Sequence, residues 1–387
     1  MPNRLRVRVL RTIEECRTLR ADWSRLVQME GLGVTGFDVT ATFEWSEALW
    51  QGFLNSAPQF VLVAEDDSGV RGILPCMITR EVVHGIPRRV LSSIGALYEL
   101  RTGFLVAGDA DVLGCLFDYL RNHLKGWDTF VFRVVDTSPS DRALQTVAQR
   151  GHLDIHLQRQ WLTPFIAVHQ EPAQVLAGLK SNMRTRLRRR DKKLQTLGRL
   201  EMRLFDSEES VPEFLELMLA VETRSWKQQA GTAMTESERQ KRFYALVTPV
   251  AAREDWFLGA ALLLDDRPVA FQYGYAFGRS YVGEKTSYDN EYRDYGVGSA
   301  LTARLLEVLS ARGISAFDLG GEADANKAQW TDESYSRRMY VVYNSTLRGL
   351  LVKASTMMRS RWIAWRRPNA GAQPDSTTQA DGERESP

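Results

Sequence analysis

Hydrophobic and polar positions follow two different periods along the first half of the chain. Residues 5–10 (LRVRVL) alternate with the period of two that is typical of a strand, whereas residues 12–29 repeat apolar positions with helical spacing behind a threonine cap. The segment QFVLVAEDDSGVRGILPCMI predicts a hairpin with its turn at 66–69. The pattern then predicts a helix near 112–124, a strand at 129–135, a helix near 143–150 and a strand ending near Trp161.

The second half repeats this order of elements. WFLGAALLLDDRPVAFQYGYAF again predicts two strands joined by an acidic turn, at 265–268, and YVGEKTSY (281–288) predicts a third strand. A glycine-containing stretch, a helix ending near Arg312 and the short strand of GISAFDLGG follow, and GWDTFVF, from Gly126, holds the equivalent place in the first half. We therefore expect a mixed α/β fold of tandem duplicated lobes, residues 1–165 and 166–345. A C-terminal helix (346–367) and a polar, disordered tail (368–387) are expected to complete the chain.

The composition restricts the class of protein. At 387 residues the chain exceeds what one core usually supports, and 44% apolar with 25% charged residues is typical of a globular protein in water. Cys16, Cys76 and Cys115 are few and far apart, which favours reduced thiols in the cytoplasm. The amino terminus lacks the apolar core of a signal peptide, and no segment approaches the length of a membrane span. The net charge of +2 indicates no particular partner.

The stretch RDYGVGSALTARLLEVL (293–309) places two glycines directly before an apolar-periodic helix. It is not a Walker loop, because no Gly-Lys-Ser/Thr follows, and Leu301 stands where the dinucleotide-binding fingerprint has Gly or Ala. Glycines allow positive φ and close approach of a ligand, and the first amides of a helix attract anions. The stretch therefore predicts a phosphate-binding cradle, with a simple strand-to-helix turn as the alternative. Its residues are Arg293, Asp294, Tyr295, Gly296, Val297, Gly298, Ser299 and Ala300.

This pattern of strand, Arg-x-x-Gly-x-Gly, helix and strand resembles the acyl-CoA site of the GNAT acetyltransferase superfamily. VETRSWK (221–227), the hairpin at 265–266 and FDLGGEADANKAQW (317–330) are similar to its BioF2-like, or CelD-type, branch, which is related to the two-lobed Fem-type aminoacyl transferases. The resemblance is clearest over 179–343, and Phe43, Trp45 and the GILP strand carry it in the first half. It implies acetyl-CoA, or another acyl-CoA, as co-substrate. ELRTGFLV (99–106) lacks the second glycine, so the first lobe is expected not to bind it.

Acyl transfer to an amine requires a group that takes a proton from the amine and a donor for the developing negative charge. All five histidines precede residue 170, which leaves carboxylates, tyrosines and lysines in the second half. GNAT enzymes often carry a glutamate on the strand before the glycine stretch, and Glu284 stands there in an apolar setting that would raise its pKa. A surface glutamate paired with Lys285 or Lys227 is the alternative. The catalytic candidates are Glu284, Glu322, Lys327 and Tyr335, with Tyr340 as a further possible acid, and the substrate-binding candidates include Trp226 and Trp330.

Two further segments carry candidate binding surfaces. LKSNMRTRLRRRDKK (179–193) is basic, and Arg184, Arg188 and Lys192 form one helical stripe that could bind tRNA, an anionic lipid-linked precursor or a nucleotide sugar; a solvated helix face is the alternative. No aromatic residues interleave with it, so general attraction of anions is the preferred interpretation and DNA is not expected. Residues 347–365 could lie on an anionic membrane surface, although a helix packed on the second lobe is the favoured interpretation.

His152 and His156 have the four-residue spacing of a helical metal site, but their segment has strand character and no third ligand nearby, so no metal is expected. The sequence as a whole predicts a cytoplasmic N-acyltransferase that acts on an amine of a small molecule, or of a sugar or cell-envelope polysaccharide precursor, with peripheral contact to the inner membrane face as a further expectation. The sugar acceptor is implied only by the CelD-type resemblance. One alternative is a Fem-like transferase that uses aminoacyl-tRNA. The other is a non-catalytic accessory protein of exopolysaccharide (cellulose-type) biosynthesis.

Overall fold

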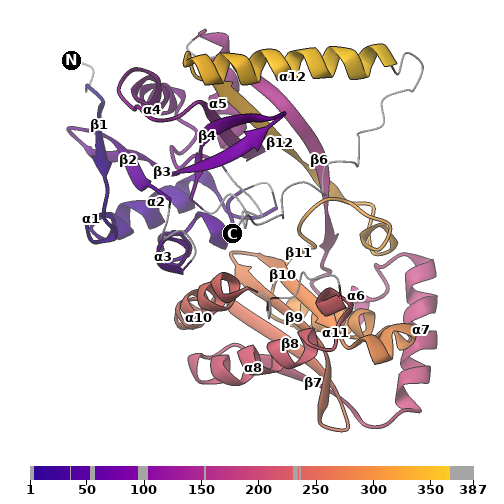
Figure 1. Ribbon diagram of the computed structural model, residues 1–387. Coiled ribbons are helices and arrows are strands. Elements are labelled where there is room, and N and C mark those ends of the chain that lie inside the picture. Colours follow the sequence, from indigo (N-terminus) through magenta and orange to yellow (C-terminus); the bar gives the residue numbers. More distant parts are fainter. Residues whose placement is uncertain are drawn as a thin grey trace.

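The strand-forming segments of both halves join one mixed sheet. The computed structural model describes residues 4–34, 36–52, 57–94, 103–151, 154–229, 234 and 237–366 (Figure 1). In this part of the chain, twelve strands follow the order β1-β2-β3-β4-β5-β12-β6-β11-β10-β9-β8-β7, with helices packed against the sheet. The predicted mixed α/β class is therefore confirmed.

The first half contains six of these strands. Thr12 caps the first helix through a reciprocal capping box with Glu15, as the sequence indicated. The elements of this half are β1 (Arg6–Leu10), α1 (Ile13–Arg17), α2 (Arg20–Glu30), η1 (Val39–Ala41), α3 (Phe43–Gly52), β2 (Gln59–Asp66), β3 (Gly69–Val83), β4 (Ile86–Ser93), α4 (Ala110–Asn122), β5 (Thr129–Val135), α5 (Pro139–Gln149) and β6 (Ile155–Ala167).

The second half begins with two helices and then repeats the strand order. Its β-hairpin turns at Asp265 and Asp266, both of which adopt the positive φ that a tight two-residue hairpin requires. The elements are α6 (Pro172–Val175), α7 (Ser181–Gln195), β7 (Leu200–Phe205), η2 (Glu208–Ser210), α8 (Val211–Glu222), α9 (Trp226–Gln229), α10 (Glu238–Arg253), β8 (Phe257–Leu264), β9 (Arg267–Phe277), β10 (Ser280–Tyr288), η4 (Asn290–Tyr295), α11 (Val297–Ala311), β11 (Ala316–Asp318), η5 (Lys327–Gln329), β12 (Ser334–Tyr343) and α12 (Leu347–Arg366).

The two halves share one topology. In each, an edge strand precedes an antiparallel meander of three strands, and a helix then crosses to a strand parallel to the third. This unit is β1-β2-β3-β4-α4-β5 in the first half and β7-β8-β9-β10-α11-β11 in the second. The internal duplication inferred from the sequence thus has a structural counterpart.

Each half also supplies a strand to the other half. β6, which follows α5 of the first half, pairs with β11, whereas β12 from the second half pairs with β5. β6 and β12 pair with each other, so they join the two units into one sheet. The predicted boundary between residues 165 and 166 falls inside β6, and the division into domains stays a prediction.

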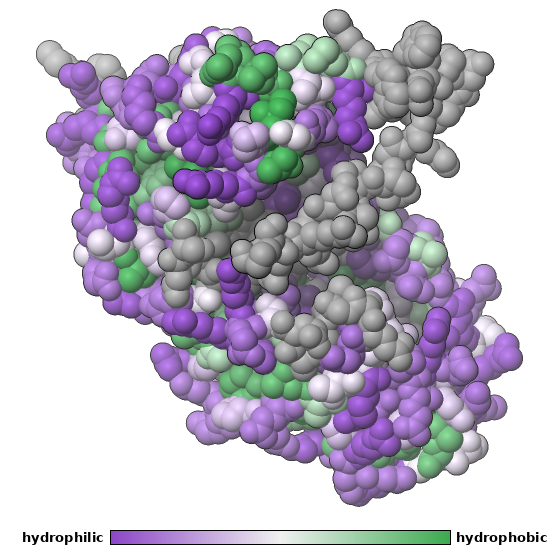
Figure 2. Space-filling model, in the orientation of Figure 1, coloured by the Kyte–Doolittle hydropathy of each residue, from purple (hydrophilic) through white to green (hydrophobic). Residues whose placement is uncertain are grey.

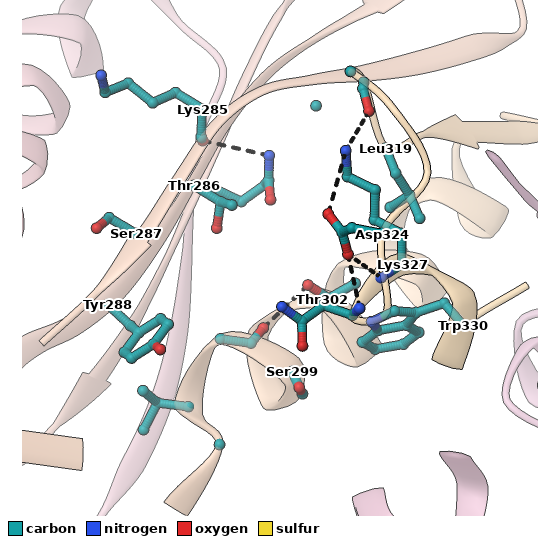
Figure 3. A pocket seen from close by; sticks show the side chains of 18 of the residues that line it. Lys285, Thr286, Ser287, Tyr288, Ser299, Thr302, Leu319, Asp324, Lys327 and Trp330 are labelled. Carbon is teal, nitrogen blue, oxygen red and sulfur yellow. Dashed lines mark hydrogen bonds and ion pairs between the residues drawn. The ribbon is translucent and has the colours of Figure 1, made fainter. Parts of the chain in front are cut away.

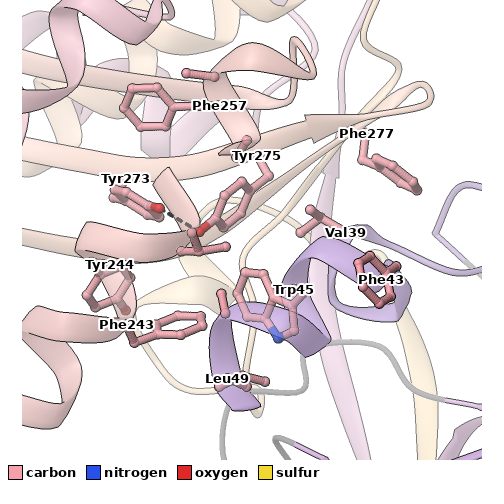
Figure 4. Close-up of a cluster of buried hydrophobic side chains, with 14 of the residues drawn as sticks. Val39, Phe43, Trp45, Leu49, Phe243, Tyr244, Phe257, Tyr273, Tyr275 and Phe277 are labelled. Atoms are coloured by element: carbon pink, nitrogen blue, oxygen red, sulfur yellow. Dashed lines mark hydrogen bonds between the residues drawn. The ribbon is translucent and has the colours of Figure 1, made fainter. Parts of the chain in front are cut away.

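One apolar cluster is shared by the two halves and fixes how they meet (Figure 4). Helix α3 packs against α10, and the indole of Trp45 meets the ring of Phe243 at 5.0 Å and that of Tyr275 at 5.4 Å. Trp45 is only 1% exposed, so its replacement by Ala is expected to cost about 3–5 kcal/mol. This interface holds the first half against the side of the second half that carries α8 and α10.

Several local predictions differ from the structure. The single helix expected at 12–29 is divided near Thr18, whose hydroxyl donates to the carbonyl of Glu15 at 2.7 Å and competes with helix bonding. Helix α3 and strand β4 were not predicted, and the strand expected to end near Trp161 continues to Ala167. Residues 99–102 of ELRTGFLV and the tail at 368–387 lie outside the described residues.

The C-terminal helix packs on a strand of each half, and not on the second lobe alone as the favoured sequence interpretation had it. α12 lies along β4 and β12, where Val352 is fully buried and the Ser355 hydroxyl is 3.3 Å from Nδ1 of His84. Its outer face is apolar, and Figure 2 shows hydrophobic residues at the surface in this region of the molecule. The exposed apolar side chains of α12 are Leu347, Leu350, Leu351, Met357 and Met358. None of the described helices is long and apolar enough to cross a membrane.

Candidate active site

The divergence of two parallel strands creates a cavity in the second half. β10 pairs with β11 only through Ser280–Val282, in the register Ser280↔Ala316 to Val282↔Asp318. Beyond this point the remaining residues of β10, 283–288, line a cavity of about 1150 Å³ together with the amino end of α11 and the loop after β11 (Figure 3). The cavity therefore contacts both the glycine stretch and the strand that carries Glu284.

The glycine stretch adopts the conformation that its sequence predicts. Gly296 has φ 70° and ψ 39°, the left-handed conformation that favours glycine, and α11 begins at the next residue. The first amides of a helix have no intrahelical acceptor, so those of 297–299 are available at the cavity wall. The members of the predicted cradle that line the cavity are Arg293, Gly296, Val297, Gly298 and Ser299.

The other three predicted cradle residues have different surroundings. The Tyr295 ring lies 4.2 Å from Nζ of Lys193, and Ala300 is buried beside α7. Ala300 also lines a second cavity of about 480 Å³ between α6, α7 and α11. Asp294 is exposed and lies outside the set of described residues that line the first cavity.

Two arginines from α7 line the cavity beside the predicted cradle, and the sequence interpretation missed them. Nη1 of Arg190 donates to the hydroxyl of Ser299 at 3.1 Å, and Arg186 lines the same cavity. Burial, followed by the charge of Arg186, lowers the pKa of Arg190. Among the described residues, no carboxylate lies within 4.0 Å of the guanidinium of Arg186, Arg190 or Arg293. Three under-compensated cations at a helix amino terminus form a site suited to a phosphate.

The arginines predicted to bind substrate face a different cavity. Arg184 and Arg188 line the smaller cavity, beside Asp191 and Arg304, and Arg184 donates to the carbonyl of Ala177 at 2.9 Å. A different feature of the α7 sequence indicates which of its arginines contacts the main cavity. Apolar residues at 183, 187 and 194 form its buried stripe, and Arg190 occupies the position in that stripe where another apolar residue is expected.

Glu284 occupies a bulge in β10. The register with β9 shifts between Gly283 and Lys285, so Glu284 is the inserted residue. Its Oε1 accepts a hydrogen bond from the hydroxyl of Tyr244 at 3.3 Å, whereas Oε2 is buried and has no hydrogen-bond partner among the described residues. Burial raises the pKa of Glu284 to about 7, and the nearby charge of Asp38 adds to this while Lys285 opposes it. A carboxyl group of this kind can accept a proton near neutral pH.

Lys285 and Lys227 pair with another carboxylate, not with Glu284. Glu222 is fully buried, and its Oε1 lies 3.3 Å from Nζ of Lys285 and 3.8 Å from Nζ of Lys227. Its Oε2 accepts from the backbone amide of Met234 at 2.6 Å. Burial lowers the pKa of Lys227 to about 8, and the charge of Lys285 acts in the same direction while that of Glu222 opposes it. Both lysines line the main cavity.

The loop after β11 contributes one of the predicted catalytic residues to the cavity. Lys327 lines it, but its Nζ donates to the carbonyls of Gly320 at 2.6 Å and Glu322 at 2.9 Å, so this ammonium group holds the loop closed (Figure 3). Burial lowers the pKa of Lys327. The Glu322 side chain is exposed and pairs with Arg159, outside the set of described cavity-lining residues.

The remaining predicted side chains divide between the cavity and the core. Trp226 and Trp330 both line the cavity. The hydroxyl of Tyr335, in contrast, donates to Oδ2 of buried Asp318 at 2.7 Å, and Tyr340 packs in the first-half core, where its hydroxyl accepts from Nε2 of Gln145 at 3.0 Å. Neither tyrosine is among the described residues that line the cavity.

His156 belongs to β6, in agreement with the strand character of its segment, and its Nε2 lies 2.9 Å from Oδ1 of Asp154. His152 lies outside the described residues. Within the described ranges, no three side chains of His, Cys, Asp or Glu are grouped so as to hold a metal ion.

Comparison with known proteins agrees with this geometry. Residues 181–330 match the family model described as an acetyltransferase (GNAT) domain. FemX has a similar structure, with a TM-score of 0.57, 12% identity, and coverage of 86% of this chain and 98% of that chain. A conserved protein of unknown function from Bacteroides thetaiotaomicron follows, with a TM-score of 0.51, 12% identity, and coverage of 86% and 97%. None of the curated proteins matches the chain in sequence.

A third similar structure is the C-terminal DUF2156 domain of an Agrobacterium fabrum protein, with a TM-score of 0.51, 12% identity, and coverage of 90% of this chain and 97% of that chain. Residues 181–330 therefore carry a segment similar to the acetyltransferase (GNAT) domain, and the chain has the overall fold of FemX.

Proposed function

We propose that this acyltransferase uses an acyl-CoA, most simply acetyl-CoA, and transfers the acyl group to an amine. The observation that carries the proposal is Glu284, whose buried carboxylate lies on the wall of the same cavity that reaches the glycine cradle. A base near the amine and a phosphate site for the acyl donor are the two requirements of this reaction.

The donor would bind at the α11 side of the cavity. The amides of 297–299 and the guanidinium groups of Arg186, Arg190 and Arg293 suit a pyrophosphate, whose oxygens accept charge-assisted hydrogen bonds. The edge of β10 from 283 to 288 is not paired with β11, so its backbone groups can bond the amides of the pantetheine arm as an added strand would. This arrangement would direct the thioester toward Glu284.

Glu284 would act as the general base. Its carboxylate takes a proton from the acceptor amine as the nitrogen attacks the thioester carbonyl, a C–N bond forms, and the C–S bond then breaks to release CoA thiolate. The proton held on Glu284 can pass to that thiolate, which balances the reaction. The Tyr244 hydroxyl donates to Oε1 of Glu284 and would fix the orientation of this carboxylate. Tyr335 and Glu322, the other predicted catalytic residues with ionisable oxygens, contact Asp318 and Arg159 instead.

The acceptor amine would enter near Trp226, whose side chain is 46% exposed and lines the cavity. An indole at such a position can stack on a sugar ring, which supports an amino sugar or a polysaccharide precursor as acceptor. This part of the proposal relies on the CelD-type resemblance of the sequence together with the aromatic cavity wall.

Calorimetric titration with acetyl-CoA tests the donor site. We expect micromolar binding by the wild type and its loss in Gly298→Trp, because the new indole would fill the cavity beside Tyr288, whose Cδ1 lies 3.5 Å from an ideal Cβ at Gly298. An unchanged melting temperature serves as the control for folding. If folded wild-type protein binds no acetyl-CoA, the acyl-CoA proposal is wrong. Salt-sensitive binding of aminoacyl-tRNA would then support the Fem-like alternative.

We further propose that the enzyme contacts an anionic membrane surface through α12. Every charged residue of this helix is basic, and its exposed apolar side chains form the outer face described above. A helix with one apolar face and basic flanks binds at the lipid headgroup region without spanning the bilayer.

A further inference from the structure

We infer that the acceptor carries an acidic group, a carboxylate or a phosphate, which binds between Lys227 and Lys285 while its amine lies at Glu284. This inference deepens the proposed function and rests on it. The sequence did not predict these lysines as substrate-binding residues. It indicated them only as possible ion-pair partners of Glu284.

The bulge in β10 directs two consecutive side chains to the same side of the sheet. Glu284 contacts the Tyr244 hydroxyl at 3.3 Å, and Nζ of Lys285 lies 3.4 Å from Oε1 of Gln240. Tyr244 and Gln240 are four residues apart on α10, so they share one helix face. In an uninterrupted strand, neighbouring side chains point to opposite faces. The base and the ammonium group of Lys285 therefore face α10 together.

The donor cradle lies on the other side of the strand. The apolar face of α11 packs in a cluster with α7, whereas α10 packs in the cluster shared with the first half. In Figure 3 the Lys285 side chain points away from Ser299 and Thr302, which belong to α11. A substrate that contacts Lys285 therefore reaches Glu284 from the side opposite the donor phosphates.

The charges around the two lysines become unbalanced when an ammonium group occupies Glu284. Lys227 and Lys285 share the single carboxylate of Glu222, and within the described part of the chain no other carboxylate lies within 4.0 Å of either Nζ. Nζ of Lys227 also donates to the backbone carbonyl of Thr286 at 2.8 Å. Glu222 thus compensates one of the two positive charges, and the Glu284 carboxylate, which interacts with Lys285 from beyond 4.0 Å, offsets the other. When an ammonium group occupies Glu284, one buried positive charge of the lysine pair is left over, and an anion is needed to compensate it.

An acceptor with both an amine and an acidic group satisfies the whole site. Its ammonium form would neutralise the Glu284 carboxylate on binding, and its acidic group would compensate the excess charge of the lysine pair. Glu284 and Lys285 are consecutive and both face α10, so one small molecule can reach both side chains, such as an amino acid or a phosphorylated amino sugar. A simple alkyl amine or a polyamine would leave the lysines uncompensated.

Matched pairs of acceptors test this inference. We would measure release of CoA thiol from acetyl-CoA with alanine against alaninamide, and with glucosamine 6-phosphate against glucosamine. The acidic member of at least one pair is expected to have a kcat/KM about tenfold or more above its neutral partner, the effect of one charge-assisted hydrogen bond. The pair that shows the preference distinguishes a carboxylate from a phosphate. Equal values within both pairs, or a preference for the neutral members, would overturn the inference.

Substitutions of Lys285 test whether the lysine pair causes the preference for an acidic acceptor. Lys285→Met is expected to remove the preference for the acidic acceptor and to leave acetyl-CoA affinity unchanged, while Lys285→Arg retains part of the preference. Lys241→Met is the matched control, because Lys241 lies on α10, the helix that Lys285 faces, and pairs with Glu238 at the surface. Equal loss with both acceptors in Lys285→Met would contradict a role in recognising the acid.

If no probe pair is acetylated, phosphate binding provides a second measurement. Protein saturated with CoA has its donor cradle filled, so calorimetric binding of inorganic phosphate that is lost in Lys285→Met would support the inference, and absence of binding would overturn it. Failure of the proposed function is recognised separately, because wild-type protein would then not bind acetyl-CoA. Failure of the present inference alone leaves acetyl-CoA binding intact.

Discussion

The side chain of Arg190 lies against the backbone of Gly296. A Cβ built on Gly296 would be 2.4 Å from Cδ and 2.6 Å from Nε of Arg190, closer than real Cβ contacts allow. Gly296 also has φ 70°, so its lack of a side chain serves both the turn into α11 and the approach of the guanidinium. The arginine that completes the cradle and the glycine that shapes it therefore depend on each other.

Gly296→Ala is expected to weaken acetyl-CoA binding at least tenfold, because the methyl group must displace Arg190 from the cradle. Gly313→Ala is the matched control, since Gly313 has φ 72° at the other end of the same helix and nothing lies within 4 Å of its ideal Cβ. Both substitutions carry a similar backbone strain of about 1 kcal/mol, but only the first affects the cradle. Calorimetry and thermal unfolding measure the two effects. Equal acetyl-CoA affinity in the two variants would contradict the arrangement.

Arg190→Ala and Arg186→Ala are each expected to weaken acetyl-CoA binding by about tenfold to a hundredfold, the range for one charge-assisted hydrogen bond. Arg184→Ala and Arg188→Ala are the controls, because these side chains line the smaller cavity. Dissociation constants measured at low and moderate salt would show the difference. A larger loss of acetyl-CoA affinity in the two control variants would show that the phosphates bind in the smaller cavity instead.

Glu284→Gln is expected to lower kcat by about 10²- to 10⁴-fold, the usual contribution of a general base. In the wild type, burial raises the pKa of Glu284 to about 7, so the rate should fall with decreasing pH below this value as the base becomes protonated. Glu322→Gln should retain the rate, because Glu322 pairs with Arg159 outside the cavity. A full pH–rate profile of all three proteins checks the assignment.

Thermal unfolding provides a readout for Glu284 that does not depend on activity. Glu284 has a higher pKa in the folded state, about 7, than its value of 4.5 in the unfolded state. The folded protein therefore loses stability as the pH rises from 4.5 through about 7. Glu284→Gln should therefore unfold at a higher temperature than the wild type at pH 8 and differ little at pH 4. The opposite order at pH 8 would show that Glu284 is not held in an apolar environment.

Local chemistry made the glycine cradle and the hairpins predictable. Gly296, Asp265 and Asp266 adopt positive φ, a conformation that few other residue types favour. These residue types therefore indicate the positions of the turns directly in the sequence. The position of Glu284 followed from its place in a strand before the glycine stretch. The bulge that turns Glu284 and Lys285 to one side was not predictable, since it depends on the register with β9.

Long-range pairing explains most of what the sequence did not predict. The sequence makes Tyr335 a candidate acid, but its bond to Asp318 depends on the pairing of β12 with β6 and of β6 with β11, which periodicity within a segment does not encode. The face of α7 that meets the cavity was misassigned because charge was considered without burial. Arg190, placed within the apolar stripe, is the residue that such a comparison would have identified.

Asp128 is expected to make stability depend on pH in acid. Burial alone would raise its pKa, but hydrogen bonds from Arg89 and Thr346 outweigh burial and lower the pKa from 3.8 to about 2. The stabilisation is present above pH 3.8 and is lost as pH falls through about 2, with a size of at most about 2 kcal/mol. Asp128→Asn should remove this dependence, whereas exposed Asp67→Asn should not. Urea unfolding across pH 2–5 provides the comparison.

The outer face of α12 gives the last prediction. Wild-type protein should sediment with vesicles that contain phosphatidylglycerol and not with neutral phosphatidylcholine vesicles, and added salt should weaken the binding, because the flanking charges of the helix are basic. Leu351→Glu with Met358→Glu should abolish sedimentation, since both side chains are exposed on this face. Leu204→Glu is the control, an exposed leucine on β7, the edge strand of the second half. Equal binding to neutral vesicles, or an equal loss in the control, would show that α12 does not recognise the membrane surface.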